Sequence, residues 1–72
     1  MTVYVTNQWN GQGKQDYYWH EYRVEGDMVV KYKCNKFKLF DGDENNWEYE
    51  EKAIESWELD DPNMPDWLRT KL

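Results

Sequence analysis

The feature that most constrains the fold is a pair of alternating runs on either side of Gly26. Apolar, aromatic and imidazole side chains recur at every second position before this glycine and again after it, at Tyr18, His20, Tyr22 and Val24 and then at Met28, Val30, Tyr32 and Cys34. Such a period of two, interrupted by glycine, is typical of two antiparallel strands joined by a tight turn. The sequence therefore predicts a β-hairpin whose turn contains Gly26.

The length of the turn decides which side chains share a face. A three-residue loop, Glu25-Gly26-Asp27, pairs Val24 with Met28 and places both alternating sets on one side of the hairpin. A two-residue Gly26-Asp27 turn would set Tyr22 beside Lys31 and would bury neither face cleanly. We therefore expect the three-residue loop, which also places His20 opposite Tyr32, Glu21 opposite Lys31 and Trp19 opposite Lys33.

After Cys34 the alternation changes phase, because Phe37 and Leu39 fall at odd positions. One extra residue near Asn35, a β-bulge, would return them to the inner face. That face then carries Met28, Val30, Tyr32, Cys34, Phe37 and Leu39. The outer face would carry a stripe of four lysines, Lys31, Lys33, Lys36 and Lys38.

The remaining segments predict a small α+β fold. Residues 2–9 alternate β-branched and aromatic side chains and indicate a strand, and residues 41–46 are typical of a loop. Residues 47–59 fit two structures: a helix gathers the aromatic and apolar side chains on one broad face, whereas a strand loses its alternation at Ala53-Ile54. We favour the helix and keep the strand as the alternative.

A short helix beginning near Pro65 would place Leu68 and Leu72 over one side of the core. The fold class is therefore a small antiparallel sheet of three to four strands with one or two C-terminal helices, in a single domain over residues 1–72. Five Trp, six Tyr and two Phe in 72 residues supply the apolar area that so short a chain needs in order to fold.

One cysteine excludes an internal disulfide, no apolar run approaches the roughly 20 residues of a membrane span, and the first residues lack a signal-peptide pattern. We expect a cytoplasmic protein without membrane contact. The sequence holds no convincing catalytic or metal-binding motif. His20 has no apparent nucleophile beside it, and Cys34 lies on the inner face. The calcium-loop spacing that begins at Asp41 has Lys52 where glutamate is required. We expect no enzyme activity, no metal and no cofactor.

The charge is concentrated in one segment. Residues 41–61 hold ten acids and one base, Lys52, which gives a net charge of −9. In a helical conformation, at about 1.5 Å per residue, this charge would fall at about one per 3.4 Å, comparable to a nucleic-acid strand. The predicted protein-binding residues are these acids and one aromatic anchor: Asp41, Asp43, Glu44, Glu48, Glu50, Glu51, Glu55, Glu58, Asp60, Asp61 and Trp57.

These features favour a small acidic inhibitor that blocks a basic, nucleic-acid-handling protein by mimicking the charge of DNA or RNA. In size, acidity and aromatic content the chain is similar to many small phage-encoded proteins that inhibit host enzymes or defence systems, a likeness of composition that carries over no residue. The alternatives are a nucleic-acid-binding module that uses the lysine stripe and sheet aromatics, or an accessory interaction protein. An open sheet edge would also allow a homodimer.

Overall fold

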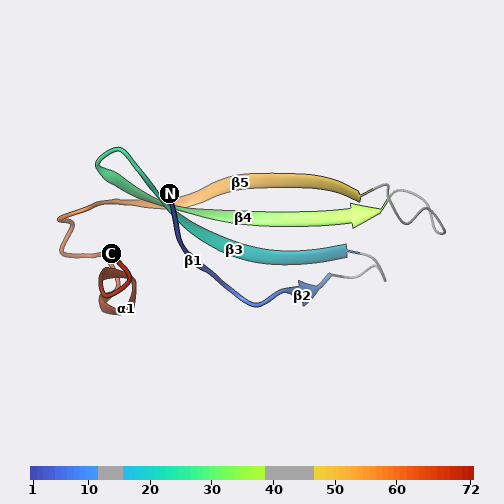
Figure 1. The fold of residues 1–72 in the computed structure, drawn as a ribbon, viewed down its shortest axis with the longest axis horizontal. Helices are drawn as coiled ribbons and strands as arrows, with labels where there is room; N and C mark the ends of the chain where they lie inside the picture. Colours follow the sequence, from blue (N-terminus) through green and yellow to red (C-terminus); the bar gives the residue numbers. More distant parts are fainter. Residues whose placement is uncertain (12–15, 39–46) are drawn as a thin grey trace.

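The computed structural model describes residues 1–11, 16–38 and 47–72. These residues form one antiparallel sheet in the strand order β1-β3-β4-β5, with β2 beside β3, and a short helix at the turn end (Figure 1). The elements are β1 (Thr2–Val5), β2 (Trp9–Asn10), β3 (Asp16–Glu25), β4 (Met28–Lys38), β5 (Trp47–Glu58) and α1 (Asp66–Arg69). The small antiparallel sheet is confirmed, whereas the C-terminal helix is only four residues long.

The β3–β4 hairpin turns through two residues, so the expected three-residue loop is wrong. Glu25 pairs with Met28, and the ladder runs without interruption to Asp16 and Phe37. Gly26 has φ +60, the conformation that a two-residue type II′ turn requires at its first central position. His20 consequently lies opposite Lys33, Glu21 opposite Tyr32 and Trp19 opposite Cys34, in place of the expected partners.

The expected bulge near Asn35 is also wrong, because Asn35 pairs in register with Tyr18 on one side and Glu50 on the other. The irregularity lies in β5, where Lys31 pairs with Glu55 and Tyr32 with Ala53, which leaves Ile54 as the extra residue. The two alternating sets of the hairpin therefore face opposite sides of the sheet. We call them the core face, with Tyr22, Val29 and Trp57, and the open face, with Trp19, Tyr32 and Cys34.

Residues 47–58 form a strand, so the favoured helix is wrong. The phase change at Ala53-Ile54, which argued against a strand, is absorbed by the bulge. β4 would otherwise leave the backbone donors and acceptors of every second residue without a partner on that side. Pairing with β5 satisfies these groups along the whole length of β4.

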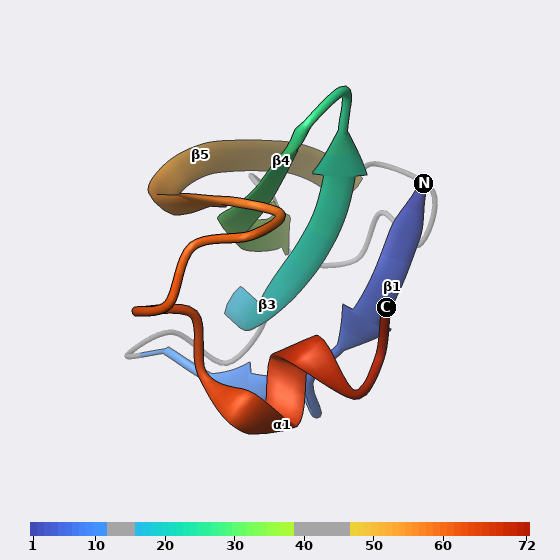
Figure 2. The ribbon, with the colours of Figure 1, turned by 90° about the vertical axis from the view of Figure 1, so that its left-hand side faces the viewer.

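The hydrophobic core lies on the core face, at the turn end of the sheet. Tyr22, Val29 and Trp57 from the strands pack against Met64 and Leu68 from the C-terminal segment, which passes from β5 back toward β1 (Figure 2). Leu68 and Val29 are fully buried, as the sequence predicts for Leu68, whereas Leu72 is half exposed. Trp67 packs its ring edge-on against Tyr22 at 5.1 Å. No helix among the described residues is long and apolar enough to cross a membrane.

Gly26 offers a test of the register that the turn imposes. A Cβ at this position would meet nothing within 4 Å, so the cost of Gly26→Ala comes only from the positive φ. We expect Gly26→Ala to lower the free energy of unfolding by about 1 kcal/mol, and Gly26→Asn by less, because asparagine adopts a positive φ more readily than alanine. Urea unfolding followed by tryptophan fluorescence measures both. Equal stability of all three proteins would contradict the two-residue turn.

Candidate functional site

The acidic segment lies along an edge of the sheet. Asp41, Asp43 and Glu44 lie outside the described residues. The other seven acids, Glu48, Glu50, Glu51, Glu55, Glu58, Asp60 and Asp61, follow β5 and the turn after it. Because side chains alternate along a strand, Glu48 and Glu50 lie on the core face and Glu51 and Glu58 on the open face. These carboxylates therefore line one edge and do not share a single face.

An extended strand also lowers the linear charge density. β5 holds five glutamates and one lysine over its 12 residues, a net charge of −4. At about 3.3 Å per residue this is about one charge per 10 Å, roughly a third of the density of a nucleic-acid strand. The close match expected from a helix is lost, because that match depended on helical spacing.

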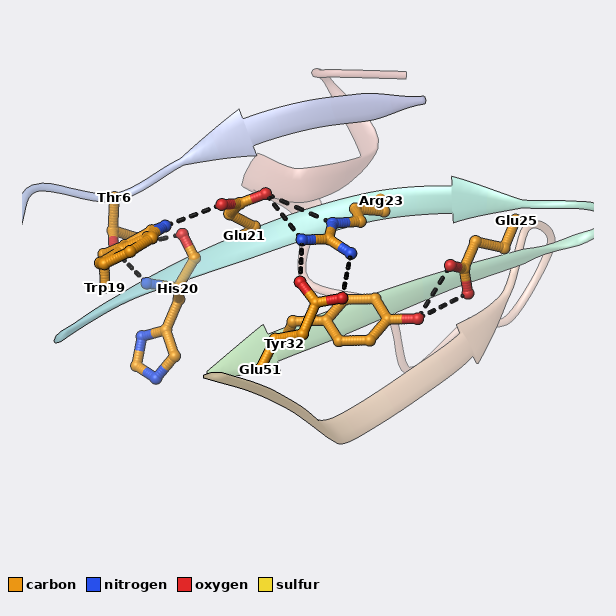
Figure 3. Close-up of polar contacts among 8 residues, drawn as sticks. All are labelled: Thr6, Trp19, His20, Glu21, Arg23, Glu25, Tyr32 and Glu51. Atoms are coloured by element: carbon orange, nitrogen blue, oxygen red, sulfur yellow. Dashed lines mark hydrogen bonds and ion pairs between the residues drawn. The ribbon is translucent and has the colours of Figure 1, made fainter. Parts of the chain in front are cut away.

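On the open face, Arg23 lies between two glutamates (Figure 3). Its guanidinium donates to Glu51 in a two-pronged pair, with Nη1 3.2 Å from Oε1, and to Glu21 Oε1 at 3.1 Å. The Trp19 indole donates to the other oxygen of Glu21 at 2.8 Å, and this bond is the largest cause of the lowered pKa of that carboxyl. Hydrogen bonds from Arg23 lower the pKa of Glu51. Glu51 is therefore held ionised in an ion pair with Arg23, which it shares with Glu21.

The same row of interactions continues toward the turn. The Arg23 guanidinium lies 4.3 Å from the centre of the Tyr32 ring, a cation–π geometry. The Tyr32 hydroxyl donates to the Glu25 carboxylate at 2.8 Å, and this bond raises the pKa of the phenol (Figure 3). A continuous chain of polar contacts thus runs along the open face from Trp19 to Glu25, and it fixes the orientation of the Glu25 carboxylate.

Two adjoining hollows at the turn end of the sheet share Met28. The first, on the open face, is lined by Glu25, Met28, Val30, Tyr32, Ala53, Ile54, Glu55 and Ser56. The second lies at the edge and is lined by Asp27, Met28, Glu58, Leu59 and Asp60. We call these residues together the turn-end site. It has an apolar floor and five carboxylates, and neither hollow is lined by a lysine or arginine from the described residues.

Antiparallel strand pairing assembles the turn-end site from distant parts of the sequence. The Gly26-Asp27 turn and the pairing of Met28 with Glu58 bring the start of β4 beside the end of β5. The Leu59 N–H donates to the Asp27 carbonyl at 2.9 Å and extends this contact beyond the strand. The bulge turns Ile54 outward, where it is 45% exposed. Glu25 and Asp27 are not among the predicted site residues, since only the antiparallel pairing of residues 28 and 58 places them here.

Two other predicted site residues have different roles. Trp57 is only 7% exposed and packs in the core, so its ring offers no surface for a partner. Asp61 caps the turn after β5, with its Oδ1 accepting from the Asn63 N–H at 2.8 Å. Glu55, Glu58 and Asp60 are the predicted acids that the structure brings together in the turn-end site.

The lysines do not form one stripe. Lys31 and Lys33 lie on the core face, and Lys36 and Lys38 lie on the open face. Each ammonium group lies over an aromatic ring of the same chain: Lys31 over Tyr22, Lys33 over Tyr18, Lys36 over Tyr17 and Trp47, and Lys38 over Trp47. The expected single basic face is therefore wrong, because it depended on a bulge near Asn35.

Cys34 and His20 show no arrangement for catalysis among the described residues. Cys34 is buried, as expected, and burial raises the pKa of its thiol to about 11. His20 has a lowered pKa, first because of burial and then because of repulsion from Lys31 and Lys33. No cluster of metal-ligating side chains occurs in the part of the chain that the structure describes.

Comparisons with protein-family models, with curated proteins and with solved structures found no match to this chain.

The Arg23 pairs predict how stability depends on pH. Glu21 and Glu51 have lowered pKa values in the folded protein, so the stability they confer is present above their ordinary value of 4.5 and is lost as the pH falls through the lowered values. Arg23→Met should cost about 1 kcal/mol at neutral pH, because Glu51 is half exposed and Glu21 keeps its hydrogen bond from Trp19. It should remove part of the loss of stability below pH 4.5, since the Trp19 bond still lowers the pKa of Glu21. Urea unfolding across this pH range tests this.

Arg69→Met is the matched control for that experiment, because the Arg69 guanidinium donates to the Asp61 carbonyl and forms no ion pair in the described residues. We expect this variant to keep the acid dependence of the original protein. If Arg23→Met and the original protein lose stability in parallel on acidification, the ion pairs of Arg23 do not govern the acid dependence of stability.

Cys34 should be unreactive in the folded protein. A rise of the thiol pKa from 9.0 to about 11 lowers the thiolate fraction at pH 8 by about 100-fold, and burial slows access further. We expect a thiol reagent to label the protein at least about 100-fold more slowly in buffer than in concentrated urea. Rapid labelling of the folded chain would show that the Cys34 side chain is not buried.

Proposed function

We propose that this protein is a non-catalytic binding protein that docks a basic protein partner at the turn-end site. The observation that carries the proposal is the apolar floor at Met28 and Ile54, surrounded by five carboxylates and lined by no basic side chain of the described residues. An apolar hollow gives affinity to an inserted side chain, and a rim of one sign selects the charge around that side chain. The matching partner carries an exposed apolar residue flanked by lysines or arginines.

The finer part of the proposal concerns the partner class. Proteins that handle nucleic acids carry basic surfaces, and an acidic protein bound there would exclude the polyanion. This chain has a net charge of −6, so association would be faster at low ionic strength. We propose inhibition of such a protein by occupation of its basic surface. The support is the charge and the apolar anchor of the turn-end site, and no longer the linear charge density.

Direct nucleic-acid binding is the weaker candidate. A basic face for stacking needs aromatic rings that are free on one side, with lysines beside them. Here the lysines are divided between two faces and lie over the rings. The rings are therefore less available to bases, which favours the protein partner.

A pair of charge-reversal variants tests the proposal. Glu58→Lys reverses a carboxylate in the turn-end site, and Asp66→Lys makes the same charge change in α1, on an exposed side chain away from it. Both variants and the original protein serve as immobilised baits for a lysate of the source cell. We expect the specific partner to be basic, to stay on the original and Asp66→Lys baits, and to bind Glu58→Lys about tenfold or more weakly when purified and titrated.

A competition experiment tests the inhibition. The purified partner is titrated with labelled DNA or RNA in the presence of this protein, and we expect displacement by the original protein and by Asp66→Lys but not by Glu58→Lys. A partner that binds Glu58→Lys and Asp66→Lys equally well at physiological salt would refute the turn-end site as the binding surface.

A further inference from the structure

β5 leaves the longest open edge of the sheet. It pairs only with β4, so the backbone groups on its other side have no strand partner among the described residues. The opposite edge consists of β1, with four residues, and β2, with two, and the pairing of β1 shifts register. An unpaired edge is a template for a further strand. β5, with 12 residues, is therefore the edge that can pair with a second chain over a useful length.

The side chains of residues 47–51 give this edge a defined chemistry. Glu48 and Glu50 are exposed on the core face, and neither forms an ion pair with a described residue. Between them Tyr49 is 67% exposed on the open face. Glu51 follows on the open face and is already paired with Arg23. An incoming strand would meet two unpaired carboxylates on one side and an exposed ring on the other.

The charges and the exposed ring along residues 47–51 favour one kind of incoming strand over others. A second copy of the same edge would bring together two segments, residues 47–52, that each hold three glutamates and one lysine, Lys52. Each segment therefore carries a net charge of −2, and like net charges across a strand pair are destabilising. A neutral strand would leave the two carboxylates partly desolvated without a cation. A strand with alternating basic and apolar residues would pair its cations with Glu48 and Glu50 and its apolar side chains with Tyr49.

We propose that the basic partner binds as an extended segment that adds a strand to residues 47–51 of β5, with basic residues at alternate positions. This inference rests on the proposed function and deepens it, because the same partner would reach the turn-end site. The bulge at Ile54 interrupts a regular ladder, so the added strand ends there. At that point the apolar hollow beside Ala53 and Ile54 begins and accepts a side chain of the departing segment.

The probe is a short peptide of alternating lysine and valine, compared with a block peptide of the same composition in which all lysines precede all valines. Fluorescence anisotropy with the full chain at low salt measures both affinities. We expect the alternating peptide to bind about tenfold more tightly, since only it can place a cation opposite each glutamate. Equal affinity of the two peptides would overturn strand addition.

Two further peptides test the backbone pairing directly. A strand directs the N–H groups of alternate residues to opposite edges, so N-methylation of all lysines blocks one edge and N-methylation of all valines blocks the other. We expect one methylated peptide to keep its affinity and the other to lose about tenfold or more. If both bind as well as the unmethylated peptide, the segment docks through its side chains alone and strand addition is wrong.

Charge variants separate this inference from the proposed function. Glu50→Lys should weaken binding of the alternating peptide about tenfold, and the matched Asp66→Lys should leave it nearly unchanged. If Glu58→Lys weakens binding of the natural partner but Glu50→Lys and backbone methylation have no effect, strand addition fails and the turn-end site stands. If none of these charge reversals weakens binding, both proposals fail.

Discussion

The two-residue turn at Gly26 is the constraint on which the rest of the structure depends. Its positive φ fits a tight type II′ hairpin and sets Glu25 opposite Met28, and the other nine pairs of β3 and β4 follow from that one pairing. Because side chains alternate along a strand, a shift of one residue would exchange the two faces of one strand. The observed register brings Tyr22 beside Val29 on the core face, where Met64 and Leu68 cover them.

The register of the hairpin also determines where the acidic residues lie. β5 completes the ladder of β4 and becomes the edge of the sheet, so its glutamates stand along an open row of backbone groups. Charged side chains on an edge oppose pairing with a second copy of the same chain. In the binding mode that we propose, the same carboxylates attract a basic chain, so protection from self-association and selection of a partner would have one physical cause. Arg23 withdraws Glu51 from this set by pairing with it on the open face.

Much of the sheet is predictable from the sequence, since local alternation is visible without coordinates. The hairpin, the burial of Cys34 and the contribution of Leu68 to the core agree with the pattern. The single strand expected over residues 2–9 is wrong in its extent, because the structure divides it into β1 (Thr2–Val5) and β2 (Trp9–Asn10). The turn length was not predictable in this way, because the three-residue loop follows only if all apolar residues of the hairpin share one face. In the structure both faces carry apolar groups, and the open face satisfies its polar groups through Arg23 and its two glutamates.

The sequence by itself determined the alternating strands, the glycine turn, the concentration of acids in residues 41–61 and the lack of an internal disulfide, because each follows from composition or short-range order. Only the tertiary structure decided that residues 47–58 are a strand, since that choice depends on the unpaired side of β4 and on a bulge at Ile54. The tertiary structure also decided which acidic residues lie together in the turn-end site. Glu25 and Asp27 join Glu58 and Asp60 through antiparallel pairing, a long-range contact that no local pattern encodes.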